Sequence, residues 1–230
     1  MNAYRQSDCC CAGRLPALAP AHWPKLQAMN ASMIEVRRYS GEAIAPYLDD
    51  LARLRIAVFR EWPYLYEGDL AYEAEYLQTY LRSWRSIAVL AFDGAQVVGA
   101  STGLPLSDES DAFLTPFADS AVDSKKVFYC GESVLLPAYR GRGLGHRFFD
   151  EREAHARSLG GFDWTGFCAV ERAADDQRRP PFQRSNDEFW GKRGYRQRPE
   201  LRASLPWREI GRGEVAHSLA FWLRPLERQR

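Results

Sequence analysis

The sequence has no hydrophobic run near the ~20 residues that a helix needs to cross a membrane. We therefore predict no membrane partner. It also has no excess of one charge, with 31 Lys and Arg against 30 Asp and Glu in 230 residues. Because acidic residues interleave with the arginines of the C-terminal third, no block of positive charge forms. We predict no nucleic-acid partner.

Cysteine is scarce, with five residues, an odd number. Cys9, Cys10 and Cys11 are adjacent and have no partner cluster at metal-site spacing, so no metal centre is predicted. Cys130 and Cys168 fall in predicted strands, where a buried free thiol is the usual state. The odd count and the lack of a secretory signal predict a cytoplasmic protein.

The first 32 residues have little that could form a core, and Pro16, Pro20 and Pro24 interrupt any helix there. We predict that residues 1–32 are a disordered extension, or that the native start lies further downstream. Residues 33–230 are long enough to bury one hydrophobic core and are predicted to form a single domain. A monomer and a homodimer both remain open.

Apolar periodicity predicts the order of the regular elements. In chain order they are strand 33–39, helix 41–60, helix 69–84, strands 86–92, 96–104 and 127–136, helix 143–159, strand 162–170, helix 187–192 and strand-like pieces at 195–198, 201–207 and 217–223. Residues 61–68 form a loop rich in aromatic residues, and 105–126 and 171–186 read as polar loops.

Several local signals refine this order. Asp69 is a plausible N-cap, Asp93-Gly94 a hairpin turn, and Arg55 is expected on the solvent side of its helix. Strands 127–136 and 162–170 are joined by a helix and must therefore be parallel. The predicted fold is α+β, with one mixed sheet of about seven strands flanked by helices.

The most informative stretch is Arg140-Gly141-Arg142-Gly143-Leu144-Gly145, which joins strand 127–136 to helix 143–159. A glycine-rich turn between a strand and a helix presents unpaired backbone N–H groups at the positive end of the helix dipole. Such a site binds anions, most often phosphate, and glycine lets the phosphate approach the backbone. Arg140 and Arg142 add positive potential.

Two familiar phosphate motifs do not fit this turn. The dinucleotide fingerprint needs a wider last glycine spacing, and the nucleotide P-loop needs a lysine followed by Ser or Thr. The pattern [QR]-x-x-G-x-[GA] does fit, through Arg140, Gly143 and Gly145. With the preceding Leu-Leu-Pro and the following Phe148-Phe149, the turn resembles the acetyl-CoA-binding motif of the GNAT acyltransferase superfamily.

The resemblance implies a GNAT-like fold from residue 33 to about residue 224, with parallel strands four and five splayed apart beyond Leu136 and Val170. It implies acetyl-CoA as co-substrate, with the pantetheine arm on the backbone of Val134, Leu135 and Leu136. The residues implied to bind the diphosphate are Arg140, Gly141, Arg142, Gly143, Leu144, Gly145 and His146.

The implied activity is transfer of an acetyl group to the amine of a small molecule or peptide by direct attack. The alternatives are a catalytically idle CoA-binding or sensor module of the same fold, and a different enzyme of a phosphate-bearing ligand. An attacking amine must lose a proton, so a base is expected near the cleft. Glu132 is the first candidate: it is either a base whose pKa is raised by desolvation, or a strand residue that faces solvent or pairs with arginine. Glu171 is the second candidate, before Tyr129 and His146.

The general acid is unassigned, because Trp190 stands where many family members have a tyrosine. Tyr195, Tyr129 or water could replace it, or CoA could leave as the thiolate. An acyl-cysteine route through Cys130 or Cys168 lacks a recognisable histidine partner. For the acceptor, the aromatic side chains Trp62, Tyr64 and Tyr66 form a wall, or simply pack under the loop. A cationic amine could pair with Glu67, Asp69 or Glu75.

Overall fold

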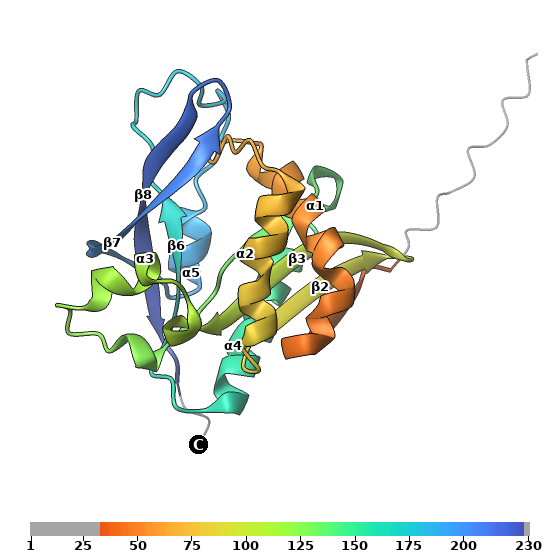
Figure 1. Ribbon diagram of the computed structural model, residues 1–230, viewed down its shortest axis with the longest axis vertical. Coiled ribbons are helices and arrows are strands. Elements are labelled where there is room, and N and C mark those ends of the chain that lie inside the picture. The colour runs from red at the N-terminus through yellow and green to blue at the C-terminus, as the bar shows by residue number, and fades with distance from the viewer. Residues whose placement is uncertain (1–32, 228–230) are drawn as a thin grey trace, which may run out of the picture. The chain divides into compact units, whose positions relative to one another are not determined.

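The computed structural model describes residues 33–227, and the predicted extension at 1–32 lies outside them (Figure 1). The strands are β1 (Glu35–Tyr39), β2 (Ile87–Asp93), β3 (Gln96–Pro105), β4 (Val127–Tyr129), β5 (Ser133–Leu135), β6 (Trp164–Val170), β7 (Arg196–Glu209) and β8 (Gly213–Pro225). The α-helices are α1 (Leu48–Phe59), α2 (Leu70–Arg82), α3 (Asp111–Leu114), α4 (Leu144–Leu159) and α5 (Asp187–Lys192).

The strands form one mixed sheet in the order β1-β2-β3-β4-β6-β8-β7, and β5 pairs with β3. The pairing of β4 with β6 is parallel, as the connection through α4 requires. The predicted α+β architecture with a mixed sheet is therefore confirmed. The described sheet has eight strands rather than about seven, because the predicted strand 127–136 is divided into β4 and β5.

Both faces of β2 are buried, which explains its unbroken apolar sequence IAVLAF. Alternate residues point to opposite faces of a strand. Leu90 packs with the core side chains of α1 and α2, and Val89 packs with Phe148 of α4. Figure 1 shows α1 and α2 on one face of the sheet and α4 on the other. The sheet is thus the middle layer of a helix–sheet–helix sandwich.

Several local predictions are confirmed. The Asp69 carboxylate accepts a hydrogen bond from the Tyr72 N–H at 2.9 Å and caps α2. Gly94 has φ +60° between β2 and β3, where the hairpin turn was predicted. The short helix at 187–192 is α5.

Other elements differ from the prediction. The helix expected at 41–60 begins with a 3₁₀ helix, Gly41–Tyr47, which contains Pro46, and α1 starts only at Leu48. Proline has no N–H for the helical ladder. The stretch 105–126 holds α3 and three short 3₁₀ helices, Leu106–Asp108, Thr115–Phe117 and Ser124–Lys126. Three of these helices each bury one apolar side chain in the core, namely Leu106, Phe113 and Phe117. The C-terminal pieces join into the β7–β8 hairpin, with a register shift between Arg198 and Arg202.

A β-bulge separates β4 from β5. Tyr129 pairs with Leu104 of β3, and Ser133 pairs with Ser101, so this strand advances one residue more than β3 does. A bulge bends its strand and increases the local twist. The Cys130 N–H still donates to Gly166 of β6 at 2.7 Å, but β5 pairs only with β3. The parallel strands therefore part at Cys130 and Gly166, earlier than predicted.

Two side chains shape the bulge. A Cβ atom on Gly131 would overlap the Tyr80 hydroxyl and lie 2.9 Å from Thr102 Oγ1, so only glycine fits. On the other face, Arg152 of α4 is buried and donates through Nη1 to the carbonyls of Glu132 at 3.0 Å and Thr102 at 3.3 Å. Through Arg152, helix α4 thus binds the backbone of β3 and of the bulge that faces it, at the point where the sheet opens.

Candidate functional site

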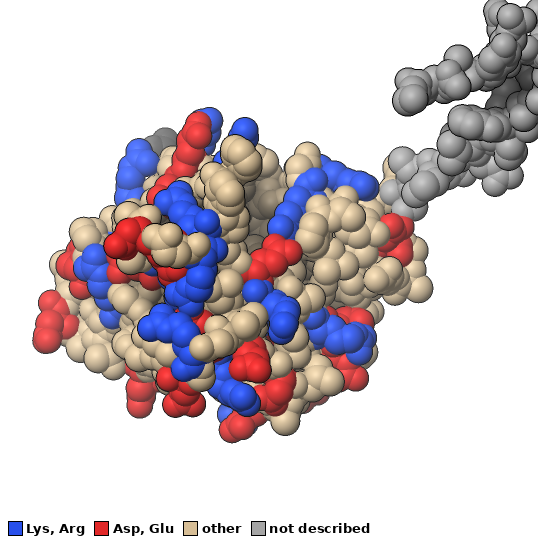
Figure 2. All heavy atoms as spheres, turned by 90° about the horizontal axis from the view of Figure 1, so that it is seen from above, with Lys and Arg blue, Asp and Glu red and all other residues tan. Residues whose placement is uncertain are grey.

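Two cavities meet at the bulge. The sheet cavity, about 640 Å³, lies between β5 and β6 and reaches Gly145 and Trp190. The hairpin cavity, about 380 Å³, lies between the α1–α2 loop, α3 and the β7–β8 hairpin. Both are lined by Phe59, Tyr64, Gly131, Glu132 and Cys168. Seen from above, the surface is hollowed near its centre, with basic and acidic side chains around the hollow (Figure 2). Two ligands could therefore meet at one point inside the protein.

The turn before α4 is open at the backbone. Gly141 and Gly143 have φ of +75° and +80°, and a Cβ atom at either would find nothing within 4 Å. Gly143 is the N-cap of α4 and has no side chain to cap the helix. The first N–H groups of an uncapped helix have no intrahelical partner. This geometry fits the predicted anion site.

The charged side chains of this turn are held by the protein itself. Arg140 donates to the Leu135 carbonyl at 3.0 Å and pairs with Glu61 at 2.8 Å. Arg142 donates to the Ala138 carbonyl at 3.0 Å. His146 packs at the helix start, where its Nδ1 lies 3.3 Å from Arg193 Nη1. Arg140 thus links the turn to the aromatic loop.

The backbone predicted to bind the pantetheine arm, residues 134–136, is only partly free of hydrogen bonds to β3. The Leu136 N–H donates to Val98 of β3 at 3.0 Å, so the prediction that it is free was wrong. Hydrogen-bonded pairs alternate along an antiparallel ladder, so Val134 also points its backbone toward β3. The backbone groups of Leu135, and of Ser133, which was not predicted, point toward the gap between β5 and β6.

Glu132 belongs to a buried charge cluster. Its side chain is 1% exposed, and its Oε2 accepts from Arg55 Nη1 at 2.5 Å and from the Tyr80 hydroxyl at 3.4 Å. Arg55 also donates to buried Glu73 at 2.5 Å, so two carboxylates share one guanidinium. The other oxygen of Glu132, Oε1, is buried and has no partner in the described part of the chain. Of the alternatives left open by the sequence, pairing with an arginine is confirmed, and Glu132 also lies where the cavities meet. The expectation that Arg55 faces solvent was wrong.

Glu171 lies elsewhere. It lines the sheet cavity at the end of β6 and accepts from Arg202 at 2.9 Å and Ser218 at 2.8 Å. The hydrogen bond from Arg202 holds the pKa of Glu171 below its ordinary value. A carboxylate with a lowered pKa is a weaker base. Both oxygens of Glu171 accept hydrogen bonds from Arg202, whereas Oε1 of Glu132 has no partner in the described chain, so Glu132 is the better placed of the two to accept a proton.

Four aromatic residues bear on the missing general acid. Trp190 lines the sheet cavity and packs on Phe167, with ring centroids 4.8 Å apart. The Tyr195 hydroxyl donates to Glu153 at 3.1 Å, and its residue lines neither cavity. The Tyr129 hydroxyl lies 3.0 Å from Cys168 Sγ and lines the hairpin cavity. Tyr64 lines both cavities, a position that sequence spacing in an irregular loop does not reveal.

The predicted acceptor wall is divided between the cavities. Trp62 lines the sheet cavity, Tyr66 the hairpin cavity and Tyr64 both. Further aromatic residues that the sequence did not indicate as part of the acceptor wall also line the hairpin cavity: Phe59, Tyr72, Tyr76, Phe113, Tyr129 and Trp207. Of the proposed acidic partners, Glu67 and Asp69 line the hairpin cavity, and Glu75 lines neither.

The loop that carries these residues is fixed by Arg172, which lies in the predicted polar loop 171–186. Arg172 donates to the carbonyls of Pro63 at 2.6 Å and Tyr64 at 2.9 Å. Trp207 Nε1 donates to the same Tyr64 carbonyl at 3.1 Å. Arg172 also pairs with buried Glu209 at 3.2 Å. The wall shared by the two cavities is therefore held by two side chains, one that follows β6 and one from β7.

The cysteine predictions are confirmed for the residues the structure describes: Cys130 and Cys168 are free and buried. Burial raises the pKa of Cys168 to about 12, which disfavours the thiolate that a nucleophile needs. Within residues 33–227 no group of His, Cys, Asp and Glu could hold a metal ion. In the same range, no helix is both long and apolar enough to cross a membrane.

Glu109 is a second buried carboxyl near the site. Its Oε2 accepts from the Ser110 N–H at 3.2 Å, and its Oε1 is buried without a partner in the described chain. Burial raises the pKa of Glu109 to about 7, and the charge of Glu132 adds to the shift. In the unfolded chain a glutamate has a pKa of about 4.3. As the pH rises from about 4 to above 7, the folded protein must ionise a buried group, and stability is lost.

We expect Glu109→Gln to remove this pH-dependent loss, because glutamine does not ionise. The variant should exceed the wild-type protein in unfolding free energy by about 3 kcal/mol at pH 8 and by clearly less at pH 5. Urea unfolding at both pH values measures the difference, with Glu42→Gln at an exposed position as the control. An equal gain at both pH values would contradict the assignment.

Comparisons with known proteins agree with the geometry. The model of the "Acetyltransferase (GNAT) family" matches residues 51–180. No curated protein matches. Among solved structures, an acetyltransferase of the GNAT family from Staphylococcus aureus Mu50 is 15% identical with TM-score 0.53, covering 85% of this chain and 100% of that one.

Two further structures are similar. NAA60 from Arabidopsis thaliana, solved with acetyl-CoA, is 13% identical with TM-score 0.53, covering 84% of this chain and 99% of its own. The ribosomal-protein-alanine N-acetyltransferase of Brucella melitensis is 14% identical with TM-score 0.52, again covering 84% and 99%. At such identities these likenesses support the fold alone.

Proposed function

Because this chain belongs to the acetyltransferase (GNAT) family, we propose that it transfers the acetyl group of acetyl-CoA to a primary amine held in the hairpin cavity. One observation carries the proposal: a bulge parts two parallel strands, and the two resulting cavities meet at the carboxylate of Glu132. A donor and an acceptor bound in the two cavities would meet there. Holding both reactants in place supplies much of the rate of such a transfer.

The sheet cavity fits acetyl-CoA. Its diphosphate would lie on the open N–H groups at the start of α4, from Gly143 to His146. The pantetheine arm would run along the edge of β5 that does not pair with β3, at Ser133 and the Leu135 N–H, since the Leu135 carbonyl accepts from Arg140. The basic residues Arg172, Arg179 and Arg184 line the same cavity and favour an anionic ligand.

Bound acetyl-CoA supplies the thioester, whose C–S bond breaks as the amine nitrogen bonds to the acetyl carbon, giving the N-acetyl amine and free CoA. Glu132 accepts the proton that the amine loses, at the unpartnered Oε1. The Ser133 N–H, directed toward the gap, is suited to stabilise negative charge on the acetyl oxygen.

The departing sulfur also needs a proton, and Tyr64 is the phenol best suited to give it. It lines both cavities, whereas the Tyr129 hydroxyl is held against Cys168 Sγ. Burial raises the pKa of Tyr64 above its ordinary value, so at neutral pH the phenol carries the proton that the departing sulfur needs.

Gly143→Val tests the donor site. Valine at φ +80° strains the turn and places methyl groups where the phosphate would lie, so acetyl-CoA binding should weaken roughly 10-fold or more. The matched control is Gly160→Val at the other end of α4, where φ is +70° and a Cβ atom also meets nothing within 4 Å. Isothermal titration measures both affinities.

Equal affinities in the two variants, or no binding of acetyl-CoA to the wild-type protein, would refute the donor site. A protein that binds acetyl-CoA yet releases no CoA with any amine would be a binding module rather than an enzyme. The binding module is an alternative because Trp190, at the position where a tyrosine was expected, has no ionisable proton to give to the departing sulfur. Glu132 and Tyr64 at the junction favour an enzyme.

A further inference from the structure

The hairpin cavity narrows the choice of acceptor, and this inference rests on the function proposed above. We infer that the acceptor is a primary amine joined by a short alkyl chain to an aromatic ring and bearing no carboxylate. The walls, the charges at the mouth and the loop above the cavity each contribute to this assignment.

The walls are mainly aromatic. Eight rings line a cavity of about 380 Å³: Phe59, Tyr64, Tyr66, Tyr72, Tyr76, Phe113, Tyr129 and Trp207. A cavity of this size and composition suits a ring-bearing molecule, since aromatic rings pack favourably edge to face. A linear polyamine would instead need carboxylates along the whole cavity. Glu132 is the carboxylate at the inner end, where an amine must arrive.

The charges at the mouth of the cavity disfavour an acceptor that carries a carboxylate. Three exposed carboxylates, Glu67, Asp69 and Glu214, line the cavity. Its two cations are both engaged: Arg55 with Glu73 and Glu132, and Arg208 with Glu67 at 3.6 Å. A protonated amine is attracted to this mouth, whereas the carboxylate of an amino acid would meet like charge and find no free partner.

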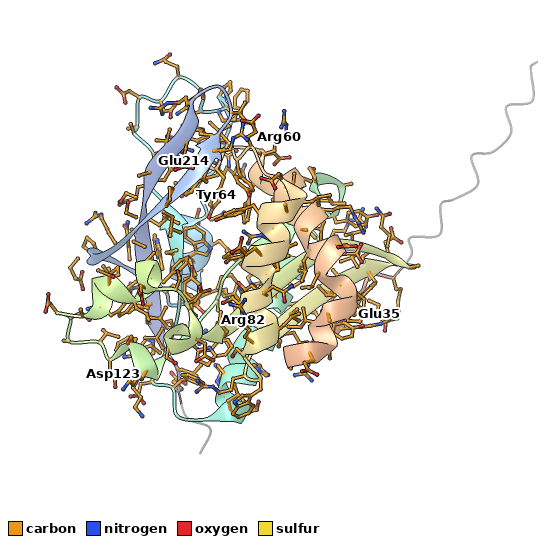
Figure 3. All side chains as sticks on the ribbon, in the orientation of Figure 1. Glu35, Arg60, Tyr64, Arg82, Asp123 and Glu214 are labelled. Carbon is orange, nitrogen blue, oxygen red and sulfur yellow. The ribbon has the colours of Figure 1, made fainter. Side chains whose placement is uncertain are left out.

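The loop and the hairpin close one side of the cavity. The Glu67 N–H donates to the Arg208 carbonyl, and the Ile210 N–H donates to the Leu65 carbonyl, both at 2.8 Å. Tyr66 and Glu209 form an isolated β-bridge between these bonds. Figure 3 shows Tyr64 and Glu214 on the loop side and the hairpin side of this region. Because the backbone is joined there, an extended peptide could not run across the cavity, and a small molecule fits better.

A panel of acceptors tests the inference. We expect kcat/KM with phenethylamine to exceed the values with phenylalanine, butylamine, spermidine and a peptide with a free N-terminus by about 10-fold or more. Phenylalanine differs from phenethylamine only by its carboxylate, and butylamine lacks the ring. CoA release is measured with each amine at saturating acetyl-CoA.

Two variants assign the preference to the cavity. Tyr72→Ala should raise the KM for phenethylamine roughly 2- to 10-fold, whereas Trp84→Ala, an exposed aromatic residue that lines neither cavity, should leave it unchanged. Glu214→Lys should raise the use of phenylalanine relative to phenethylamine.

The outcomes separate the two proposals. Faster turnover with spermidine, butylamine, phenylalanine or the peptide than with phenethylamine would overturn the inference and leave the acetyltransferase intact. An unchanged preference in both Tyr72→Ala and Glu214→Lys would also overturn it. A lack of CoA release with every amine would overturn the proposed function itself.

Discussion

Glu132→Gln should lower the turnover number of amine acetylation by about 100-fold or more, with acetyl-CoA affinity unchanged. A general base contributes roughly 10²- to 10⁴-fold. The variant should fold, because glutamine keeps an oxygen for the Arg55 guanidinium and leaves Arg55 and Glu73 as a neutral pair. Initial rates and isothermal titration measure the two quantities.

The pH dependence distinguishes loss of a base from a structural defect. As the pH rises, more of the amine is already free of its proton, so the deficit of Glu132→Gln should shrink toward high pH. Glu171→Gln is the matched control, since Glu171 lines the sheet cavity away from the junction, and its rates should stay near wild type. A deficit that is constant with pH would argue against Glu132 as the base.

Arg55→Met should destabilise the protein by about 3–5 kcal/mol, because it leaves two buried carboxylates without a positive partner. Methionine fills much of the same volume beside the Tyr76 ring, so the lost charge dominates the effect. Urea unfolding gives the free energy. The control is Arg53→Met on the same helix, where the side chain is 63% exposed and pairs with Asp50. An exposed pair contributes about 0–1 kcal/mol.

The two substitutions remove the same charge from the same helix and differ in burial, since the Arg55 side chain is 10% exposed and that of Arg53 is 63% exposed. The difference between their deficits therefore measures what the buried carboxylates lose with their cation. A deficit no larger than that of Arg53→Met would show that the cluster does not need its cation.

The features that the sequence predicted are local. Gly141 and Gly143 are recognisable because a turn with positive φ favours glycine, and Asp69 because a cap needs only the next few residues. The parallel pairing of β4 and β6 follows from the length of the connecting helix. Each of these depends on a short stretch of chain, so the local residue pattern is enough to predict the geometry.

The features that the sequence could not predict depend on residues that are far apart in the chain and meet only in the fold. Gly131 reads as an ordinary strand residue, and its role becomes visible only when Tyr80 of α2 packs against it. Arg55 sits among exposed arginines in the pattern of α1, yet it is buried because Glu73 and Glu132 meet it there. Arg172 fixes the aromatic loop although 108 residues separate it from Tyr64 in the sequence. No periodicity within one element carries such information.

Helix α4 also fixes the distance between two parts of the candidate site. It begins at Leu144, next to the open turn, and Arg152, eight residues further along, donates to the carbonyl of Glu132. At 1.5 Å per residue this interval measures about 12 Å. Inserting one residue into it would turn Arg152 by about 100° and detach it from the strand, because a helix has 3.6 residues per turn. The length of α4 therefore sets the separation between the open turn at Gly143 and the strand that carries Glu132.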